Sequence, residues 1–389
     1  MNPVMTNAAP RAETFPLEES VLFTPWRDPE SGVGSFVLKR RVAPVQQSFY
    51  FVNSGFSDDG RFLWMYCAFP PGGDAYYGRQ LAVVDFARET ARHFPETQFM
   101  DASPFVDGAT GEAYWTTGLE IWKRGPRPGD VATLVGKFPE ELARNRRPLR
   151  IATHLSRSAD GRSFAIDAQI GADWFAGDLT PAAGEKPGGF KLWRQFDICH
   201  NHAQFSPVDP DLMLLAQDGW NDPASGAEGV TQDRLWLLRR DGQLTQLVPD
   251  DPLPSSLRGH EWWDADGNHV WYIDYRRGTV KVDLRTGRHK IVWPNGHTHS
   301  HCDRPGRYLA GDVNPHDGSW RVAFYNIKTG REINIVSDLP PPPYPMRSYH
   351  IHPHPRFCLD DRYVCYTTTV LGSVDVAITP VSQLVAMTR

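Results

Sequence analysis

Five histidines recur in this sequence at one fixed distance from a repeated turn. His154, His202, His260, His299 and His354 each stand eight residues before the residue that follows a short turn, as in HLSRSADGR and HEWWDADGN. If each turn belongs to one blade of a radial repeat, equivalent positions fall on a ring around a common axis. Five imidazoles on one ring would form a site for chemistry.

Most of the remaining histidines stand close to these five. Nine of the 14 histidines fall in four clusters, which cover residues 199–205, 259–263, 297–301 and 350–355. Several form His-x-His pairs, and residues i and i+2 of an extended strand share a face. Because imidazole binds divalent transition metals, two such strands from neighbouring blades would supply three or four nitrogens to one ion.

For a single histidine, the plainer interpretation is a buried residue that is hydrogen-bonded to the backbone. Histidine at so many equivalent positions favours a functional site instead. Arg234, in the segment TQDRLW, would offer a bidentate grip on a carboxylate if it faces the channel. Trp262 and Trp263, beside one cluster, are candidates for a floor on which a sugar ring stacks.

The turns that set this spacing recur along most of the chain. Blades of a propeller repeat every ~40 to 50 residues and contain four short strands each, and the turns here are spaced at roughly that interval. The strands between them are rich in β-branched and aromatic residues, as in HVWYI and YVCYT. The chain is therefore predicted to be all-β and to form a seven-bladed β-propeller. The seven turns are anchored at Gly60, Gly111, Gly161, Pro210, Gly267, Gly306 and Asp361.

No internal domain boundary is expected. We assign residues 1–33 to an N-terminal extension and residues 34–389 to a single propeller domain. The segment 34–42 would add a strand to the last blade and close the ring, so that no sheet edge is left open.

The composition narrows the class of partner. The net charge of -5 and the pI near 6.3 give no electrostatic footprint for nucleic acid or an anionic membrane. Since no segment approaches the ~18 apolar residues of a membrane span and no secretory signal is evident, we expect a cytoplasmic protein. The five cysteines lack paired metal-type spacing, so we expect small, reduced, buried residues.

The ordered motifs of the second half resemble those of the oligogalacturonate lyases. The resemblance rests on HAQFSP with the following Asp209-Pro210, on DRLW at 233–236, on GHEWW at 259–263, on the segment from His299 to Asp312, and on HPHP at 352–355. It covers roughly residues 45–375, and the specific motifs are confined to the second half.

The resemblance implies a seven-bladed propeller with a divalent ion, typically manganese, in its central depression. It also implies β-elimination on short uronate oligosaccharides. By motif matching, His299, His352 and His354 would bind the metal, His260 would be the base and Arg234 would bind the carboxylate.

One departure from the family pattern concerns the metal. The family's glutamine ligand lies just upstream of the His-Pro-His segment, where this chain has Ser348-Tyr349-His350. Either His350 or a water completes the coordination sphere, or the metal and the substrate differ from those of the family. His301 is also an alternative to His299 as a metal ligand. Mn²⁺ is the expected ion, with Ca²⁺, Zn²⁺ and Ni²⁺ as alternatives.

The chemistry of elimination agrees with these residue types. Removing the proton α to a uronate carboxylate builds up enediolate charge, which a divalent cation and an arginine would neutralise. A neutral histidine is a suitable base near neutral pH. The leaving oxygen at C4 needs a proton, which His202, His200 or water would deliver. Substrate contacts are expected from His200, Gln204, Trp262, Trp263, Arg347 and Tyr349.

The prediction is therefore a metal-dependent lyase that releases a 4,5-unsaturated uronate from a short oligosaccharide. Two alternatives come from other classes. A propeller glycoside hydrolase would need two facing carboxylates, for which Glu261 and Asp218 are the available acids beside the clusters. A non-catalytic binding scaffold would have no need of an imidazole ring in its channel.

Overall fold

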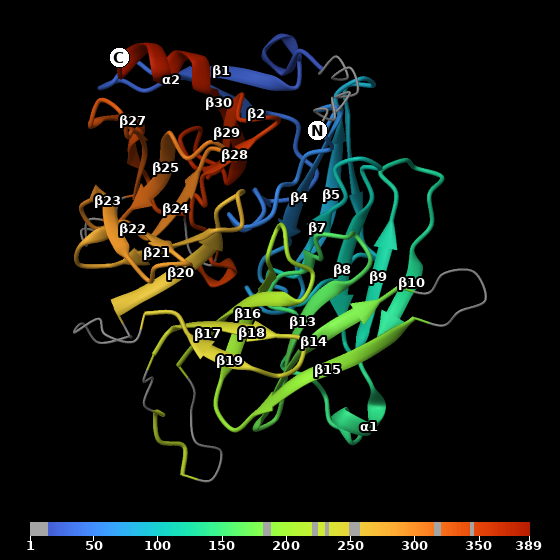
Figure 1. Ribbon diagram of the computed structural model, residues 1–389. Coiled ribbons are helices and arrows are strands. Elements are labelled where there is room, and N and C mark those ends of the chain that lie inside the picture. The colour runs from blue at the N-terminus through green and yellow to red at the C-terminus, as the bar shows by residue number, and fades with distance from the viewer. Residues whose placement is uncertain are drawn as a thin grey trace, which may run out of the picture.

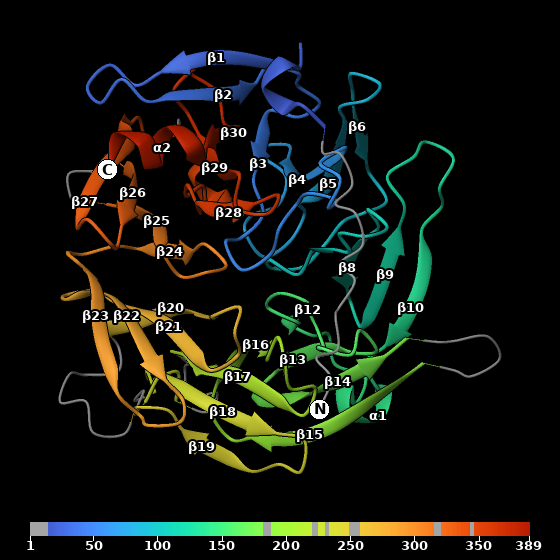
Figure 2. The same ribbon diagram turned by 45° about the horizontal axis from the view of Figure 1, so that its top comes forward.

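Seven small antiparallel sheets stand around one axis like the blades of a propeller (Figures 1 and 2). The computed structural model describes residues 15–181, 188–219, 225–229, 233–248, 257–314, 320–342 and 346–389. The prediction of an all-β, seven-bladed propeller is confirmed. In this part of the chain, no helix combines the length and the apolar composition that a membrane crossing requires.

The first three blades follow one another along the chain, each from its inner to its outer strand. Blade 1 contains β3 (Val45–Gln47), β4 (Phe62–Ala68), β5 (Gln80–Asp85) and β6 (Thr90–Phe94). Blade 2 contains β7 (Phe105–Val106), β8 (Ala113–Thr117), β9 (Glu120–Arg124) and β10 (Thr133–Lys137). In blade 3, β11 (Arg150–Ile151) and β12 (Ser156–Arg157) both pair with β13 (Phe164–Ile170), and β14 (Asp173–Thr180) and β15 (Gly189–Phe196) follow. The short helix α1 (Glu140–Ala143) precedes blade 3.

Blades 4 to 6 contain four strands each. Blade 4 contains β16 (His200–Phe205), β17 (Leu212–Gln217), β18 (Leu235–Arg239) and β19 (Leu244–Gln246). Blade 5 contains β20 (Arg258–Trp263), β21 (His269–Asp274), β22 (Gly278–Asp283) and β23 (His289–Pro294). Blade 6 contains β24 (His299–Cys302), β25 (Tyr308–Val313), β26 (Trp320–Asn326) and β27 (Arg331–Leu339).

Blade 7 joins the two ends of the chain. Its inner strands are β28 (Arg356–Cys358), β29 (Tyr363–Thr368) and β30 (Asp375–Pro380), and β30 pairs with β2 (Gly34–Leu38), which pairs with β1 (Phe23–Arg27). The helix α2 (Val381–Met387) follows β30, and 3₁₀ turns lie at Leu17–Glu19 and Met346–Tyr349. The segment 34–42 does supply the closing strand.

The expected boundary at residue 34 is wrong, because β1 is a full member of blade 7. Its five residues pair in register with β2, from Phe23 opposite Leu38 to Arg27 opposite Gly34. β1 contains Pro25, and proline is tolerated on an edge strand because it has no N–H to donate. Residues 1–14 of the expected extension lie outside the described residues.

All seven predicted turns connect the innermost strand of a blade to its second strand. Gly60, Gly111, Gly161, Gly267 and Gly306 have φ between 66° and 72°, which is the left-handed region that glycine enters at little cost. The turn signal in the sequence therefore identified both the number of blades and the point where each innermost strand ends.

Apolar side chains fill the spaces between neighbouring blades. All seven residues of β4 are buried, since this strand has another blade packed on each of its two faces. One cluster combines Val322 and Phe324 of blade 6 with Val364 and Ala377 of blade 7. The five cysteines are buried and unbonded, as expected.

Truncation of Ile378 tests how far the ring depends on its closure. Ile378 is fully buried on β30, where it lies opposite Phe36 of β2. Ile378→Ala leaves a cavity between the two ends of the chain and is expected to lower the free energy of unfolding by about 2–5 kcal/mol, measured by urea denaturation. Val21→Ala, at a position that is 54% exposed, is the control, with an expected change within about 0.5 kcal/mol. Equal effects would argue against closure as a source of stability.

Candidate active site

A pocket of about 300 Å³ lies where the inner strands of the blades converge. Tyr50 lines this pocket and is surrounded by histidine rings. Its ring centroid lies 4.9 Å from that of His354, 5.8 Å from that of His154 and 5.9 Å from that of His299. His202 lies 5.6 Å from His154, which extends the same chain of rings. The ring of imidazoles that the sequence predicts is therefore present, and it encloses a tyrosine.

Bulges aim two of these histidines into the pocket. His202 and Ala203 stand opposite one residue of β17, and His260 and Glu261 stand opposite one residue of β21. The N–H groups of His202 and Ala203, which lose their ladder partners there, donate to Thr153 and Asp167 of blade 3. A bulge turns a side chain away from the ordinary alternation of a strand, and here it does so in two adjacent blades.

The backbone at the site is strained. His202, His260, His350 and His354 have φ of 56°, 52°, 54° and 46°, in the left-handed region that residues with a Cβ enter only at a cost. Such strain persists where the surrounding structure enforces it, and it concentrates at functional sites.

Four imidazoles are close enough to hold one metal ion. Candidate ligand atoms of His299, His350, His352 and His354 all lie within 4.8 Å of one another. Nε2 of His299, Nε2 of His354 and Nδ1 of His352 are buried without a hydrogen-bond partner. Buried polar atoms without a partner are costly, and a metal ion would satisfy all three. The residues therefore fit a divalent transition metal, and His350 is the fourth member of the group.

Asp312 fixes the orientation of His299. Both of its oxygens lie 3.0 Å from Nδ1 of His299, which leaves Nε2 free for a ligand. The same carboxylate accepts the backbone N–H of His299 and of His354, so it connects blades 6 and 7. Burial raises the pKa of Asp312 to about 7, although the charge of His352 opposes the shift. A carboxylate behind a histidine ligand is common at metal sites, where it sets the tautomer and the ring angle.

Gln47 offers an oxygen atom beside this group. Its Nε2 donates to the carbonyl of His350 at 3.2 Å, whereas its Oε1 is buried without a partner. Both residues line the pocket.

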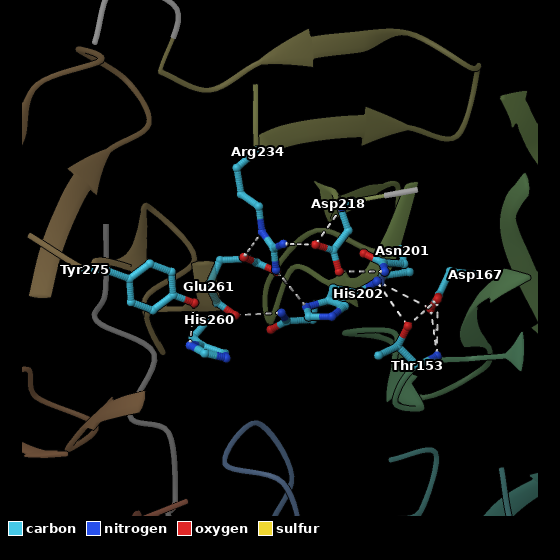
Figure 3. A network of polar contacts seen from close by, with 12 residues as sticks. Thr153, Asp167, Asn201, His202, Asp218, Arg234, His260, Glu261 and Tyr275 are labelled. Atoms are coloured by element: carbon cyan, nitrogen blue, oxygen red, sulfur yellow. Dashed lines mark hydrogen bonds and ion pairs between the residues drawn. The ribbon is translucent and has the colours of Figure 1, made fainter. Parts of the chain in front are cut away.

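A network of charged side chains also borders the pocket (Figure 3). Glu261, whose side chain is 0% exposed, receives Nδ1 of His202 at 2.9 Å and Nε of Arg234 at 3.2 Å. Arg234 also donates to Asp218 at 2.6 Å. Burial alone would raise the pKa of Glu261, but the charges of Arg234 and His202 outweigh it and lower the pKa well below its usual value. Glu261 is therefore a fixed negative charge that holds two residues of blade 4.

His260 connects the two sides. Its ring centroid lies 4.0 Å from that of His299, and Tyr275 Oη lies 3.0 Å from its Nδ1. Burial, followed by the charges of His299 and Arg234, lowers the pKa of His260 well below 6.5, so the ring is neutral at neutral pH. Gly259 makes the contact with Tyr275 possible, because a Cβ there would lie 2.3 Å from the tyrosine oxygen.

His154 has no polar role in the pocket. Both of its ring nitrogens are buried without a hydrogen-bond partner, and the ring is stacked on Tyr50 at an interplanar angle of 24°. Burial, with the charge of His202, lowers its pKa to about 3. The histidine that the sequence left unassigned is a neutral packing residue behind Tyr50.

His301 is not part of the metal group. It lies two residues beyond His299 on β24, roughly 6–7 Å further along the strand, and its ring lines a different pocket together with Arg304 and Arg356. There Nη1 of Arg356 donates to its Nε2 at 3.1 Å. The expectation that His301 competes for the metal is not supported by this position.

His200 and Gln204 lie away from the pocket. The ring of His200 stacks on Phe196 with centroids 4.0 Å apart, and its Nδ1 lies 3.2 Å from the carbonyl of Ile198. Because the bulge follows His200, it does not share a face with His202 as regular alternation predicts. Gln204 donates to the carbonyl of Glu261 at 2.8 Å and so connects blades 4 and 5.

The other expected substrate contacts also lie outside the pocket lining. Trp262 is 2% exposed and stacks parallel to Trp271, and Trp263 donates its Nε1 proton to the carbonyl of Gln204. Tyr349 is buried with its hydroxyl on the carbonyl of Gly72 at 2.7 Å. The exposed Arg347 donates to the carbonyl of Pro342. These residues pack the blades and the rim instead of forming a sugar floor.

Sequence reasoning missed the residues that blades 1 to 3 contribute, together with Tyr275 and Asp312 from the loop after β21 and from β25. Tyr50, Arg79, Arg150 and Tyr275 line the pocket, and Asp312 supports it from behind. The one signal that the sequence offers in blades 1 to 3 is the position of a residue within the repeat. Asn53 stands at the blade 1 equivalent of the phased histidines, and its side chain donates to carbonyls of blades 2 and 3.

Fold and site together define a seven-bladed propeller with a candidate metal centre beside a buried network of charges. No protein-family model matches the chain. The chain is 24% identical to an oligogalacturonide lyase of Pectobacterium atrosepticum and 23% identical to an oligogalacturonate lyase of Dickeya dadantii. Each match extends over 199 residues, which are 44% of this chain and 47% of the relative. The chain thus spans about half the length of the curated relatives that it matches.

Solved structures with the same fold give a wider match. An oligogalacturonate lyase in complex with manganese superposes with a TM-score of 0.70 at 16% identity and covers 92% of this chain and 96% of its own. An oligogalacturonate lyase from Vibrio parahaemolyticus gives 0.69 with the same identity and coverage. The resemblance that the ordered motifs indicated is confirmed.

Substitution of Asp312 tests the metal group without reference to any reaction. Asp312→Asn removes the charge that orients His299, so the affinity for Mn²⁺ is expected to fall roughly 10- to 100-fold, measured by titration calorimetry on metal-stripped protein. Asp274→Asn, also at a fully buried carboxylate that binds backbone amides, is the matched control and should leave the affinity unchanged. An unchanged affinity in Asp312→Asn would remove this carboxylate from the metal site.

Proposed function

We propose that this protein is a metal-dependent lyase that cleaves short uronate-containing oligosaccharides, related to oligogalacturonate, by β-elimination. The observation that carries the proposal is the presence, around one pocket, of a metal-competent group of four histidines, the neutral His260 and the arginine Arg234. The names of the curated relatives, and of the solved structures with the same fold, support the same substrate class.

The proposed cofactor is Mn²⁺, which the related solved structure contains. Its ligands would be His299, His350, His352 and His354. A set of four nitrogen donors also suits Ni²⁺ or Zn²⁺, and it fits Ca²⁺ poorly because that ion takes oxygen ligands. The bound ion would supply electrostatic stabilisation for the negative charge that develops on the uronate carboxylate.

His260 is the proposed base. A neutral imidazole accepts a proton at one nitrogen while the other carries its own, and the hydrogen bond to Tyr275 selects between the two forms. If Nδ1–H donates to the tyrosine oxygen, Nε2 has a free lone pair, and it is this nitrogen that we assign to removal of the C5 proton. Tyr275 is therefore a positioning residue in this scheme.

Arg234 is the proposed partner of the substrate carboxylate. Two of its nitrogens are held by Glu261 and Asp218, which fixes the plane of the guanidinium before substrate arrives. A preorganised cation costs no reorganisation when charge develops in the transition state. The two carboxylates also offset the positive charge of Arg234. We therefore assign Arg234, together with the metal ion, to orienting the carboxylate of the substrate and not to charge neutralisation alone.

The leaving oxygen at C4 requires a proton. His202 lines the pocket, and Glu261 holds its Nδ1 at 2.9 Å, so the orientation of the ring is fixed. His200, the earlier alternative, is buried behind Phe196 and cannot reach the pocket without rearrangement. We therefore assign proton delivery to His202, with the hydroxyl of Tyr275, which also lines the pocket, as the alternative.

A glycoside hydrolase is disfavoured by the state of the two acids. A general acid must keep its proton near neutral pH. The pKa values of Glu261 and Asp218 are both lowered, since the charge of Arg234 outweighs the effect of burial on each of them. Both carboxylates are also occupied by ion pairs. A binding scaffold without chemistry would not explain strained histidines with buried, unpartnered nitrogens.

Substitution of His260 tests the proposed reaction. With Mn²⁺ and oligogalacturonate, the parent protein should generate the ultraviolet absorbance of a 4,5-unsaturated product. His260→Ala should reduce that rate by roughly 10²- to 10⁴-fold, as loss of a general base does, with no loss of bound metal by elemental analysis. His289→Ala, an exposed histidine on β23, is the control. If the parent forms no unsaturated product from a broad panel of uronides, the proposal is refuted.

The contact between Tyr275 and His260 provides a second test. Gly259→Ala pushes the tyrosine oxygen aside, and Tyr275→Phe removes it. Each change should lower kcat roughly 10- to 100-fold through misplacement of His260. Because both break one contact, the double variant should be little worse than Tyr275→Phe alone. Losses that multiply in the double variant would show that the two residues act independently.

A further inference from the structure

Three arginines line the pocket, and they differ in how their charge is balanced. Arg234 is paired with Glu261 and Asp218, and Arg150 is paired with Asp101 at 2.6 Å. Arg79 has no carboxylate within 4.0 Å among the described residues. Asp101 and Asp74 attract its charge at longer range, but Arg79 is the one of the three arginines that has no direct acidic partner among the described residues.

Arg79 is nevertheless deeply buried and held in place. It is 5% exposed, and Nη2 donates to the carbonyls of Ala75 at 2.7 Å and Asp101 at 2.5 Å. Its guanidinium lies 4.8 Å from the ring centroid of Tyr66 and 5.2 Å from that of Phe99. Nε is buried without a hydrogen-bond partner. A buried cation without an acidic partner is costly, so a rigid, unpaired guanidinium at a pocket wall indicates a site for an anion.

The position of Arg79 relates that anion to the candidate metal centre. Arg79 belongs to blade 1, whereas Arg234 belongs to blade 4, on the other side of the ring (Figure 2). Arg79 and His350 both line the pocket, and Ala75, whose carbonyl accepts Nη2 of Arg79, donates its N–H to the carbonyl of Ser348, two residues before His350. The pocket therefore has one cation beside the metal group and another beside the proposed base.

An exposed aromatic side chain adjoins Arg79. Tyr76 lines the same pocket and is 56% exposed. Its backbone is fixed, since Asp74 accepts its N–H and its carbonyl accepts the N–H of Asp101. A flat, partly apolar ring next to a guanidinium suits a ligand that combines a sugar ring with a carboxylate.

We propose that Arg79 and Tyr76 form a second uronate subsite, in which Arg79 binds the carboxylate of the sugar next to the one that undergoes elimination. The inference rests on the proposed function, and it adds that the substrate is recognised through two carboxylates. Arg79 is then a residue that determines the minimum length and the esterification state of the substrate.

Binding experiments separate this subsite from the reaction. In a His260→Ala background loaded with Mn²⁺, calorimetry compares galacturonate, digalacturonate and the methyl ester of digalacturonate. Arg79→Met should weaken binding of digalacturonate roughly 10- to 100-fold, a factor that fits loss of one charge-assisted pair, and should leave galacturonate unchanged. The methyl ester should bind the background and the Arg79→Met protein equally weakly. Arg147→Met, at an exposed arginine, is the matched control.

Further measurements distinguish loss of the subsite from misfolding of the variant. Thermal unfolding and bound metal should match between Arg79→Met and its background, and Arg79→Lys, which keeps the charge without the planar fork, should bind digalacturonate with intermediate affinity. Unchanged affinity for digalacturonate in folded Arg79→Met, with an active parent, would overturn the subsite alone. Absence of both uronide binding and product formation in the parent would overturn the proposed function and the subsite with it.

Discussion

Antiparallel pairing between β2 and β30 is the contact on which the geometry of the channel depends. It joins residues near the two ends of the chain, with Phe36 opposite Ile378 and Val37 opposite Ala377. Closure brings blade 1 against blade 7, where Ser48 bonds to Thr367 and Gln47 bonds to the carbonyl of His350. Without it, the metal group on blades 6 and 7 would have no fixed relation to the pocket wall of blade 1. A closed ring also leaves fewer free sheet edges.

Within the closed ring, bulges and left-handed residues that depart from regular strand geometry form the site. A regular strand would alternate its side chains across the two faces of a blade, and few of them would point along the channel. Bulges at His202 and His260, and left-handed residues at His350 and His354, redirect side chains into one volume. Contacts between blades offset the free-energy cost of this backbone strain. Asp312 binds both His299 and the backbone of His354, and the backbone of His202 is held by Thr153. Strain at the centre is therefore tied to the packing of neighbouring blades.

Features that depend on local sequence, such as the turns, could be predicted. Features that depend on how distant strands pack, such as the edge strand and the placement of side chains in the pocket, could not. Turns with glycine at positive φ are local signals, so the number of blades followed from them. β1 was missed because Pro25 obscures an edge strand. His301 and His200 lie away from the pocket histidines, since periodicity gives the face of a residue but not the pocket that it reaches, and the bulge after His200 breaks the alternation. Arg79 and Tyr275 carry no periodic signal, since they reach the pocket from loops, before β5 and after β21.

The arrangement also separates two kinds of residue around the ring. Blades 4 to 7 contribute Arg234, Glu261 and all the ring histidines except His154, which are the groups suited to metal binding and proton transfer. Blades 1 to 3 contribute Tyr50, Tyr76, Arg79 and Arg150, which are aromatic or cationic and suited to holding a charged sugar. Changes in the first set should affect the chemical step, whereas changes in the second should affect which ligand is held and how long it must be. A seven-bladed ring allows this division, because each residue type is fixed by its own blade and the two sets meet only at the axis.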